Sequence, residues 1–153
     1  MLEFRFAKLS DVDLYYKWAN DPLVRLNSFN TEPIKYQDHV KWFSEKIKDE
    51  KFSFYLFIDS LKIPAGQVRF QKELTEIVIG ISIDEDFRGK SLGVEMLEKA
   101  TEDFLAINPE AIINAYIKES NSPSLKIFKK AGFSDERRVI VNNVESYCLS
   151  FKR

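Results

Sequence analysis

The sequence predicts an α/β (α+β) fold in one domain spanning residues 1–153, with a mixed central sheet of about seven strands flanked by about four helices. Short runs of β-branched and aromatic residues are typical of strands. Longer stretches with apolar residues three or four positions apart are typical of amphipathic helices. The two patterns are interspersed along the chain without a linker or a repeat, which favours helices packed on a single sheet.

The N-terminal part is expected to form a strand, a helix, a loop and a second helix. Residues 2–6, "LEFRF", alternate apolar and charged side chains, which predicts a half-buried strand. A helix follows, with Ser10 as its expected cap and Pro22 as its end. Residues 21–36 are polar and rich in turn formers, so a loop is predicted. The next helix is expected to bury one face, formed by Tyr36, Val40, Phe43 and Ile47.

Three strands are predicted in the middle of the chain, at residues 52–59, 65–71 and 77–83. The third has isoleucine at alternate positions, with valine, glycine and serine between them. We therefore expect this strand to be buried on one face and lined by small residues on the other.

The C-terminal part is expected to hold two helices and three strands. A helix is predicted over 91–107, and a buried strand over 111–118. The next helix should have Asn121 or Ser122 as its cap and Gly132 just past its end. Two final strands are predicted on either side of the turn "VNNVE".

Composition excludes several function classes. Lysine and arginine total 23 against 24 for aspartate and glutamate, so there is no basic excess to favour a nucleic-acid or anionic-membrane partner. No signal peptide is recognisable, and no stretch reaches the roughly 18 apolar residues of a membrane span, so a cytoplasmic location is expected.

The single cysteine, Cys148, is predicted to be a packed thiol rather than a nucleophile. Its strand, "ESYCLSFKR", could be a sheet edge that pairs in a homodimer, although a monomer is equally compatible.

The stretch "FRGKSLG", residues 87–93, joins the isoleucine-rich strand to the following helix. The first N–H groups of a helix lack partners and favour an anion. Gly89 and Gly93 remove side chains where a phosphate would approach, while Arg88 and Lys90 add positive charge. Neither G-x-x-x-x-G-K-[ST] nor G-x-G-x-x-G is present. The residues alone leave two interpretations: an ordinary strand-to-helix turn or a site for a phosphate-bearing ligand.

With its flanking strand and helix, "SIDEDFRGKSLG" resembles the acyl-CoA signature of the GNAT superfamily of acyltransferases. Arg88 and Gly93 match the ends of that signature, and Ser91, where glycine is usual, is expected to cap the helix. A second stretch, "AYIKESNSPSLKIFKKAGF", resembles the strand and helix that follow in the superfamily. The positions that match there are Asn121, Ser124, Gly132 and Phe133.

The resemblance implies acetyl-CoA as co-substrate, no metal ion, and direct attack of an acceptor amine on the thioester. It places the pantetheine arm along Ile81 and Ile83 and beside Asn121. The pyrophosphate would be held by N–H groups of Arg88, Gly89, Lys90, Ser91, Leu92 and Gly93.

The groups that move protons are less clearly predicted. A tyrosine of the last helix often protonates the departing thiolate in the superfamily, but Phe128 stands at that place, which leaves Ser124 or a water. For the base, Glu76 begins the isoleucine-rich strand on its small-residue face, and His39 has a suitable unperturbed pKa. The alternatives are a solvated carboxylate at a strand end and a surface or packing histidine.

The acceptor side carries a narrower resemblance. "WANDPLVRLNSFNTEPIKYQDHVKWF" and "GQVRF" resemble the amino-sugar N-acetyltransferase branch of the pseudaminic-acid pathway type. That branch implies a nucleotide-linked 4-amino-6-deoxy sugar as acceptor, in surface-glycan biosynthesis. Arg25 and Arg69 could pair with its anionic groups, and Asn27 and Asn30 could bind hydroxyls. Ion pairing within the protein and turn formation are the alternative roles of these residues.

Two other functions stay open from the sequence. Acetyltransferases of ribosomal-protein type, which act on peptide or protein N-termini, share the "W-x-N-D" opening. A non-catalytic acyl-CoA-binding protein is the second, since Ser91 and Phe128 both depart from the pattern of active members.

Overall fold

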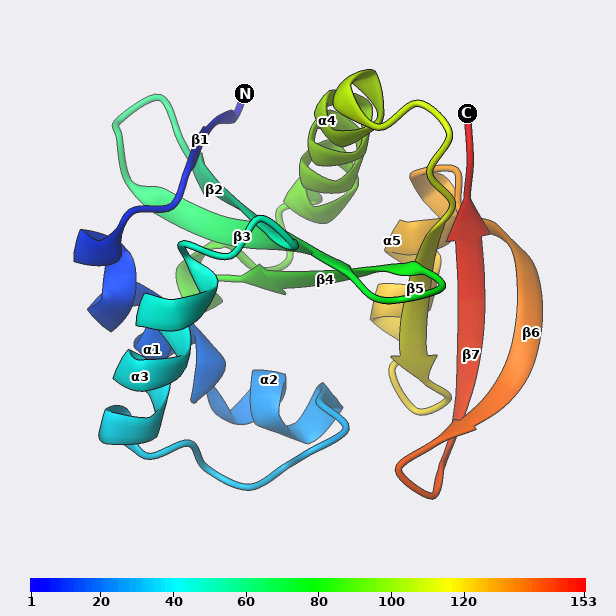
Figure 1. Ribbon diagram of the computed structural model, residues 1–153, viewed down its shortest axis with the longest axis horizontal. Coiled ribbons are helices and arrows are strands. Elements are labelled where there is room, and N and C mark those ends of the chain that lie inside the picture. The colour runs from blue at the N-terminus through cyan, green and yellow to red at the C-terminus, as the bar shows by residue number, and fades with distance from the viewer.

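The structure, a computed structural model, describes all residues from Met1 to Arg153. Its centre is one seven-stranded mixed sheet in the order β1-β2-β3-β4-β5-β7-β6 (Figure 1). Neighbouring strands are antiparallel except for β4 and β5, which are parallel. The predicted α/β (α+β) fold with seven strands is confirmed. The strands are β1 (Glu3–Phe6), β2 (Phe52–Ile58), β3 (Pro64–Lys72), β4 (Ile77–Ile83), β5 (Ile113–Lys118), β6 (Ser134–Val141) and β7 (Val144–Phe151).

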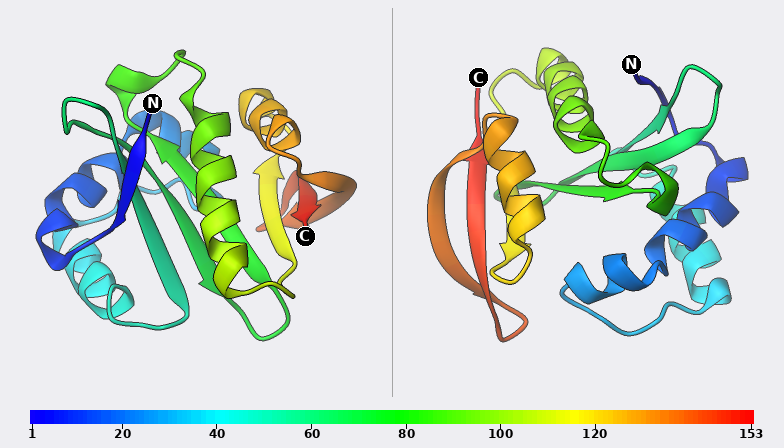
Figure 2. Two further views of the ribbon diagram at one scale, coloured as in Figure 1. Left: turned by 90° about the horizontal axis from the view of Figure 1, so that it is seen from above. Right: turned by 180° about the vertical axis from the view of Figure 1, so that it is seen from behind.

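Helices cover both faces of the sheet. Figures 1 and 2 show α1, α2 and α3 on one side, and α4 and α5 on the other. Two short 3-10 helices, η1 and η2, precede α1 and follow β4. The structure thus has five α-helices where about four were predicted. They are α1 (Val12–Ala19), α2 (Pro22–Asn27), α3 (Tyr36–Lys46), α4 (Leu92–Ile107) and α5 (Ser122–Lys130), with η1 at Leu9–Asp11 and η2 at Glu85–Phe87.

Strand alternation divides the buried side chains between two cores. The larger core joins the sheet to α4 and α5, and in it Phe70 stacks on Phe104 with ring centroids 4.2 Å apart. The smaller core joins Phe54 and Leu56 of β2 to aromatic side chains of α1 and α3. Burying one such large side chain stabilises the fold by about 1.5–3 kcal/mol. The second core therefore holds α1 and α3 firmly against the sheet.

The sheet opens between β4 and β5. Only three residue pairs join these strands, from Ile77↔Ile113 to Ile79↔Ala115. Beyond them Gly80–Ile83 pairs with β3 alone, and Tyr116–Lys118 pairs with β7 alone. Backbone groups of β4 on the β5 side are therefore left without strand partners at the carboxyl end, where the predicted acyl-CoA signature begins.

The predicted loop over residues 21–36 is wrong in its first part, because α2 begins at Pro22. Asp21 caps this helix, accepting hydrogen bonds from the N–H groups of Leu23 and Val24. Aspartate followed by proline is a recognised start of a helix. Pro22 was expected to end the preceding helix, and it begins the next one.

Two smaller expectations about helices were also wrong. Ser10 lies inside η1 and is not the cap; the Asp11 carboxylate accepts from the Lys8 N–H at 2.7 Å instead. The buried face of α3 is rotated from the predicted one, with His39 buried and Tyr36 exposed. Tyr36 stays at the surface because its hydroxyl donates to Asp13 at 2.6 Å.

The C-terminal strand β7 is not an edge, since it lies between β5 and β6. The predicted pairing of this strand between subunits is therefore wrong, and β6 is the edge on that side. Cys148 is buried, as expected for a packed thiol, and burial raises the pKa of its thiol. None of the helices is long and apolar enough to cross a membrane.

Candidate active site

A cavity of about 930 Å³ lies where β4 and β5 diverge. Residues of α1, α2 and α3 form one part of its wall, and the N-terminal ends of α4 and α5 form another. Its ionisable lining comprises three arginines, one histidine and two tyrosines, with no aspartate, glutamate or lysine. The lining therefore presents positive charge to a bound molecule and offers no carboxylate to a cation.

The segment between β4 and α4 forms the floor at one end of this cavity. No protein oxygen accepts a hydrogen bond from the backbone N–H groups of residues 88–94. Gly89 has a φ of +74°, and a Cβ built there would meet nothing within 4 Å. An open row of unpartnered N–H groups at the start of a sixteen-residue helix fits a pyrophosphate.

Three details of this segment differ from the expectation. Ser91 occupies the cap position, but its side chain makes no capping bond and its backbone has a φ of 59°, in the left-handed region. Lys90 does not line the cavity, and its ammonium lies over the Phe87 ring. A Cβ on Gly93 would lie 2.8 Å from Ile127 Cδ1, so this glycine allows α4 to approach α5 rather than a phosphate to approach the loop.

The start of α5 forms the next part of the wall. Asn121 is the N-cap, as one of the two predicted choices, and its Oδ1 accepts from the Ser124 N–H at 3.3 Å. Both residues line the cavity, which leaves the Asn121 amide NH₂ free to donate. Phe128 is buried in the same wall and packs edge-on against Phe133. An apolar ring therefore stands at the position where the superfamily often has a proton-donating tyrosine.

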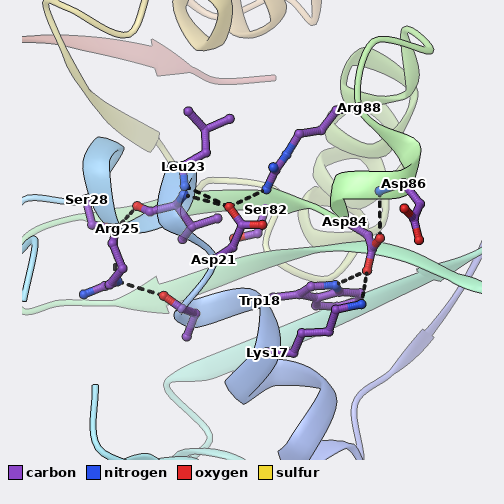
Figure 3. Close-up of polar contacts among 12 residues, drawn as sticks. Lys17, Trp18, Asp21, Leu23, Arg25, Ser28, Ser82, Asp84, Asp86 and Arg88 are labelled. Atoms are coloured by element: carbon purple, nitrogen blue, oxygen red, sulfur yellow. Dashed lines mark hydrogen bonds and ion pairs between the residues drawn. The ribbon is translucent and has the colours of Figure 1, made fainter. Parts of the chain in front are cut away.

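The short helix α2 bridges the opening between the two strands. Asp21, at its start, pairs with Arg88 of the β4–α4 segment at 2.9 Å (Figure 3). At its other end the Leu26 carbonyl accepts from Lys118 of β5 at 2.9 Å. Burial alone would raise the pKa of Asp21, but Arg88 and the capped N–H groups lower it. The helix is thus fastened to both sides of the cavity.

A second contact ties α1 to the end of β4. The buried carboxylate of Asp84 accepts from Trp18 Nε1 at 2.8 Å, from the Asp86 N–H and from Lys17 (Figure 3). These donors outweigh the effect of burial and lower the pKa of Asp84. Asp84 is therefore an ionised link between the two halves of the cavity wall.

Comparison with protein families agrees with this geometry. The model of the acetyltransferase (GNAT) domain matches residues 1–134. The chain belongs to the GNAT acetyltransferase family. It is therefore an acetyl-CoA-dependent N-acetyltransferase.

Three relatives illustrate the range of this family. A Bacillus subtilis (strain 168) protein named "Putative phosphinothricin acetyltransferase YwnH" is 30% identical over 146 residues, which cover 88% of this chain and 85% of the relative. A solved structure described as a "putative phosphinothricin N-acetyltransferase" is 25% identical, with a TM-score of 0.78 over 99% of this chain and 98% of its own. Spermidine N-acetyltransferase from Vibrio cholerae, solved with CoA and spermine, is 15% identical, with a TM-score of 0.87 over 98% and 94% of the two chains.

All four predicted acceptor residues of this GNAT domain line the cavity. The Arg25 guanidinium nonetheless binds groups of the protein itself. It donates to the carbonyls of Ala19, Asn30 and Glu32 and to the Ser28 hydroxyl. It thereby fixes the segment that carries Asn27 and Asn30. Arg69 is different, because it makes no hydrogen bond or ion pair and its guanidinium lies over the face of Trp42, 5.4 Å from the ring centre.

Glu76 lies just before β4 and does not itself line the cavity. Its Oε1 accepts from the Tyr116 hydroxyl at 2.6 Å and from Asn114 Nδ2 at 3.0 Å. Tyr116 does line the cavity, and its bond to the carboxylate raises its pKa. Sequence reasoning missed Tyr116, although it stands in β5 on the same face as Asn114, two positions away.

His39 is buried, although its ring reaches the cavity wall. Its Nε2 lies 3.0 Å from the Val12 carbonyl, and its ring stacks on Phe43. Burial lowers the pKa of His39, so the neutral ring donates its Nε2–H to Val12. This bond joins α3 to α1.

Proposed function

We propose that this enzyme acetylates the primary amine of a small acceptor that carries an anionic group, with a nucleotide-linked 4-amino-6-deoxy sugar as the first candidate. The carrying observation is the cavity wall, which holds no carboxylate and, in Arg69, a guanidinium that no acidic side chain of the protein neutralises. A sugar nucleotide has a diphosphate to match this charge. Asn27 and Asn30 supply amide groups for its sugar.

An amino-acid-like acceptor is the second candidate. The support is the Bacillus subtilis relative, at 30% identity, whose name refers to phosphinothricin. A polyamine is not proposed, although spermine is bound in the Vibrio cholerae neighbour. That neighbour shares the fold at 15% identity, and a polycation would meet no carboxylate in this cavity.

The donor half would hold acetyl-CoA through the N–H groups of residues 88–93 and the Asn121 amide, with Ile81 and Ile83 beside the pantetheine arm. The bound co-substrate supplies an activated acetyl group. Lys90 would contribute through its backbone N–H, since its side chain lies outside the cavity. Ser124 remains our candidate for protonating the thiolate, directly or through a water, because it lines the same wall.

For the base we propose Glu76 acting through Tyr116. The Tyr116 oxygen would accept a proton from the acceptor ammonium while its own proton passes to Glu76 Oε1, which is already hydrogen-bonded to it. This transfer uses a hydroxyl that lines the cavity and a carboxylate behind it. His39 is assigned a structural role, since its N–H is committed to Val12.

Variants of this pair test the proposed base. Glu76→Gln and Tyr116→Phe should each lower kcat by roughly 100-fold or more at neutral pH, with the Kd of acetyl-CoA little changed. The acidic limb of the kcat pH profile should disappear in Glu76→Gln. Glu73→Gln, in the same hairpin, is the matched control and should behave as wild type. A full acidic limb in Glu76→Gln would instead move the base role to His39.

The function itself is tested by coenzyme A release from acetyl-CoA with four kinds of acceptor: UDP-linked 4-amino sugars, phosphinothricin, spermidine and short peptides. Release with the sugar nucleotide alone establishes the first candidate, and release with phosphinothricin alone establishes the second. Peptide turnover alone would replace both with an N-terminal acetyltransferase. Binding of acetyl-CoA without release for any amine would favour the non-catalytic alternative.

A further inference from the structure

Tyr15 and Arg69 lie in the part of the cavity formed by α1, α2, α3 and β3, here called the acceptor half, and both carry hydrogen-bond donors without a partner in the protein. The Tyr15 side chain is 5% exposed and lines the cavity, and its hydroxyl makes no hydrogen bond. The Arg69 guanidinium makes no hydrogen bond or ion pair and lies against Trp42. An unpaired hydroxyl kept away from water is costly, whereas the Arg69 side chain is only partly buried. A ligand that accepts hydrogen bonds from both groups would remove this cost.

The other two arginines of the cavity wall are already bound to groups of the protein. Arg25 donates to three carbonyls and a hydroxyl, and Arg88 is paired with Asp21. Arg69 has neither kind of partner, and no carboxylate stands in the cavity wall to supply one. Among the three arginines, Arg69 is the one whose donors remain for a bound molecule.

Both groups stay in their donor form at neutral pH. Burial raises the pKa of Tyr15, so the hydroxyl keeps its proton. Burial lowers the pKa of Arg69 from its ordinary value, but a guanidinium remains protonated in proteins. Together they offer a neutral O–H and a charged fork of N–H groups, which is the donor set that binds a carboxylate or a phosphate.

The sheet gives Arg69 the room to lie in the cavity. Arg69 is the cross-strand neighbour of Gly80 in β4, and its Nη2 lies 3.9 Å from the place of a Cβ on that glycine. Two residues away on the same face, the Gln67 amide bonds Ser82 through one end, while its other end is buried without a partner. Gln67 and Arg69 therefore present a neutral and a cationic group side by side towards the acceptor.

We propose that Arg69 and Tyr15, with Trp42 backing the guanidinium, form an anion-binding subsite that selects acceptors carrying a carboxylate, phosphinate or phosphate group. The inference rests on the proposed acetyl transfer and names the residues that determine its acceptor class. The subsite binds the end of the acceptor away from the reacting amine. It admits an amino acid or a nucleotide-linked sugar equally, because the shared chemistry is the anion.

The test uses four primary amines of similar size that differ in terminal charge: 3-aminopropylphosphonate, β-alanine, propylamine and 1,3-diaminopropane. Coenzyme A release is measured with each amine, and acetyl-CoA binding is measured separately by calorimetry. We expect kcat/KM to fall in the order in which the amines are named. A preference for 1,3-diaminopropane, or equal rates for all four, would overturn the subsite.

Variants assign the preference to its residues. Arg69→Met keeps an apolar stem against Trp42 and should raise the KM of the two anionic amines about tenfold to 100-fold, with propylamine unchanged. Arg69→Lys should recover part of this loss, and Tyr15→Phe should show a smaller one. Arg138→Met, on the edge strand β6 with an exposed side chain, is the control. An anion preference that survives in Arg69→Met would also overturn the assignment.

The two proposals fail in different ways. If acetyl-CoA does not bind, the proposed acetyl transfer fails, and the subsite is then judged by calorimetry with 3-aminopropylphosphonate against 1,3-diaminopropane. The same binding comparison, on protein loaded with coenzyme A, applies if none of the four amines is turned over. Binding of the phosphonate that is lost in Arg69→Met supports the subsite, and absence of a preference overturns it.

Discussion

The two halves of the cavity are built from different parts of the chain. The donor half is made chiefly of backbone: a continuous row of N–H groups from residues 88–94, with the cap of α5 beside it. The acceptor half is made of side chains from α1, α2, α3 and β3 that are far apart in the sequence. A backbone site depends on local geometry, so many sequences can form it. A side-chain site depends on which residues meet.

The two halves also hold their charges differently. In the donor half Arg88 is neutralised by Asp21, and the helix N-terminus supplies the positive end for an anion. In the acceptor half Arg69 is left unneutralised. On our proposal, acceptor specificity is therefore determined by the side chains of the acceptor half and not by the donor half.

Substitutions at the two glycines of the β4–α4 segment, Gly89 and Gly93, should have the largest effect. Gly93→Trp should destabilise the fold by about 3 kcal/mol or more, because its Cβ already meets Ile127 and Ile83. Gly89→Asn should keep stability within about 1 kcal/mol, since asparagine tolerates a positive φ. It should nevertheless weaken acetyl-CoA binding roughly tenfold, because its side chain fills open space.

Urea unfolding and calorimetry with acetyl-CoA measure the two effects. A stable Gly93→Trp protein that has merely lost acetyl-CoA binding would show that this glycine belongs to the ligand site and not to the packing of α4 on α5.

Removing the ion pair between Asp21 and Arg88, which links the two halves of the cavity, should have the next largest effect. Asp21→Ala removes the cap of α2 and leaves Arg88 without its partner, at a cost of about 2 kcal/mol. Because α2 carries acceptor-side residues, the KM of the acceptor should rise while the Kd of acetyl-CoA stays close to that of wild type. Steady-state kinetics and calorimetry distinguish the two.

Asp59→Ala is the matched control, since Asp59 also accepts bonds from backbone N–H groups but lies in a turn away from the cavity. It should lose stability and keep its acceptor KM. Equal loss of acetyl-CoA affinity in Asp21→Ala would mean that the halves are not separable.

Restoring the family's glycine should have a smaller, stabilising effect. Ser91→Gly relieves a left-handed backbone at a residue whose side chain makes no capping bond. The expected gain is about 0.5–1 kcal/mol, seen as a rise in Tm of roughly 1–3 °C. Ser122→Gly, at the first position of α5, should give no such gain. A fall in the Tm of Ser91→Gly would indicate an unrecognised role for the hydroxyl.

The pH dependence of stability should show the smallest effect. The folded-state pKa of His39 is depressed by burial, so its contribution to stability is present above the unfolded pKa of about 6.5 and lost as pH falls through the folded value. His39→Gln keeps an N–H donor for Val12 but does not titrate. Urea midpoints should therefore fall less from pH 7 to pH 5 in His39→Gln than in wild type. Parallel curves for the two proteins would contradict this role.

The sequence by itself determined the elements whose signals are local. The isoleucine run of β4 determined its buried face, and the spacing in α4 determined its buried side, whereas the alternation in β1 did not place Phe6, which is exposed. The glycines of the β4–α4 segment and the Asn121 cap marked the donor half, because helix starts and positive φ angles depend on neighbouring residues.

Only the tertiary structure decided which ionisable groups are free to act. Arg25 and Arg69 looked alike in the sequence. In the structure, however, Arg25 donates hydrogen bonds to nearby carbonyls, and Arg69 makes no hydrogen bond to the protein. Glu76 reaches the cavity through Tyr116, forty positions along the chain, because β4 and β5 are adjacent there. Secondary structure follows from local backbone preferences. The contact of Glu76 with Tyr116 and the position of Arg69 against Trp42 are set by packing between distant segments, which no short pattern records.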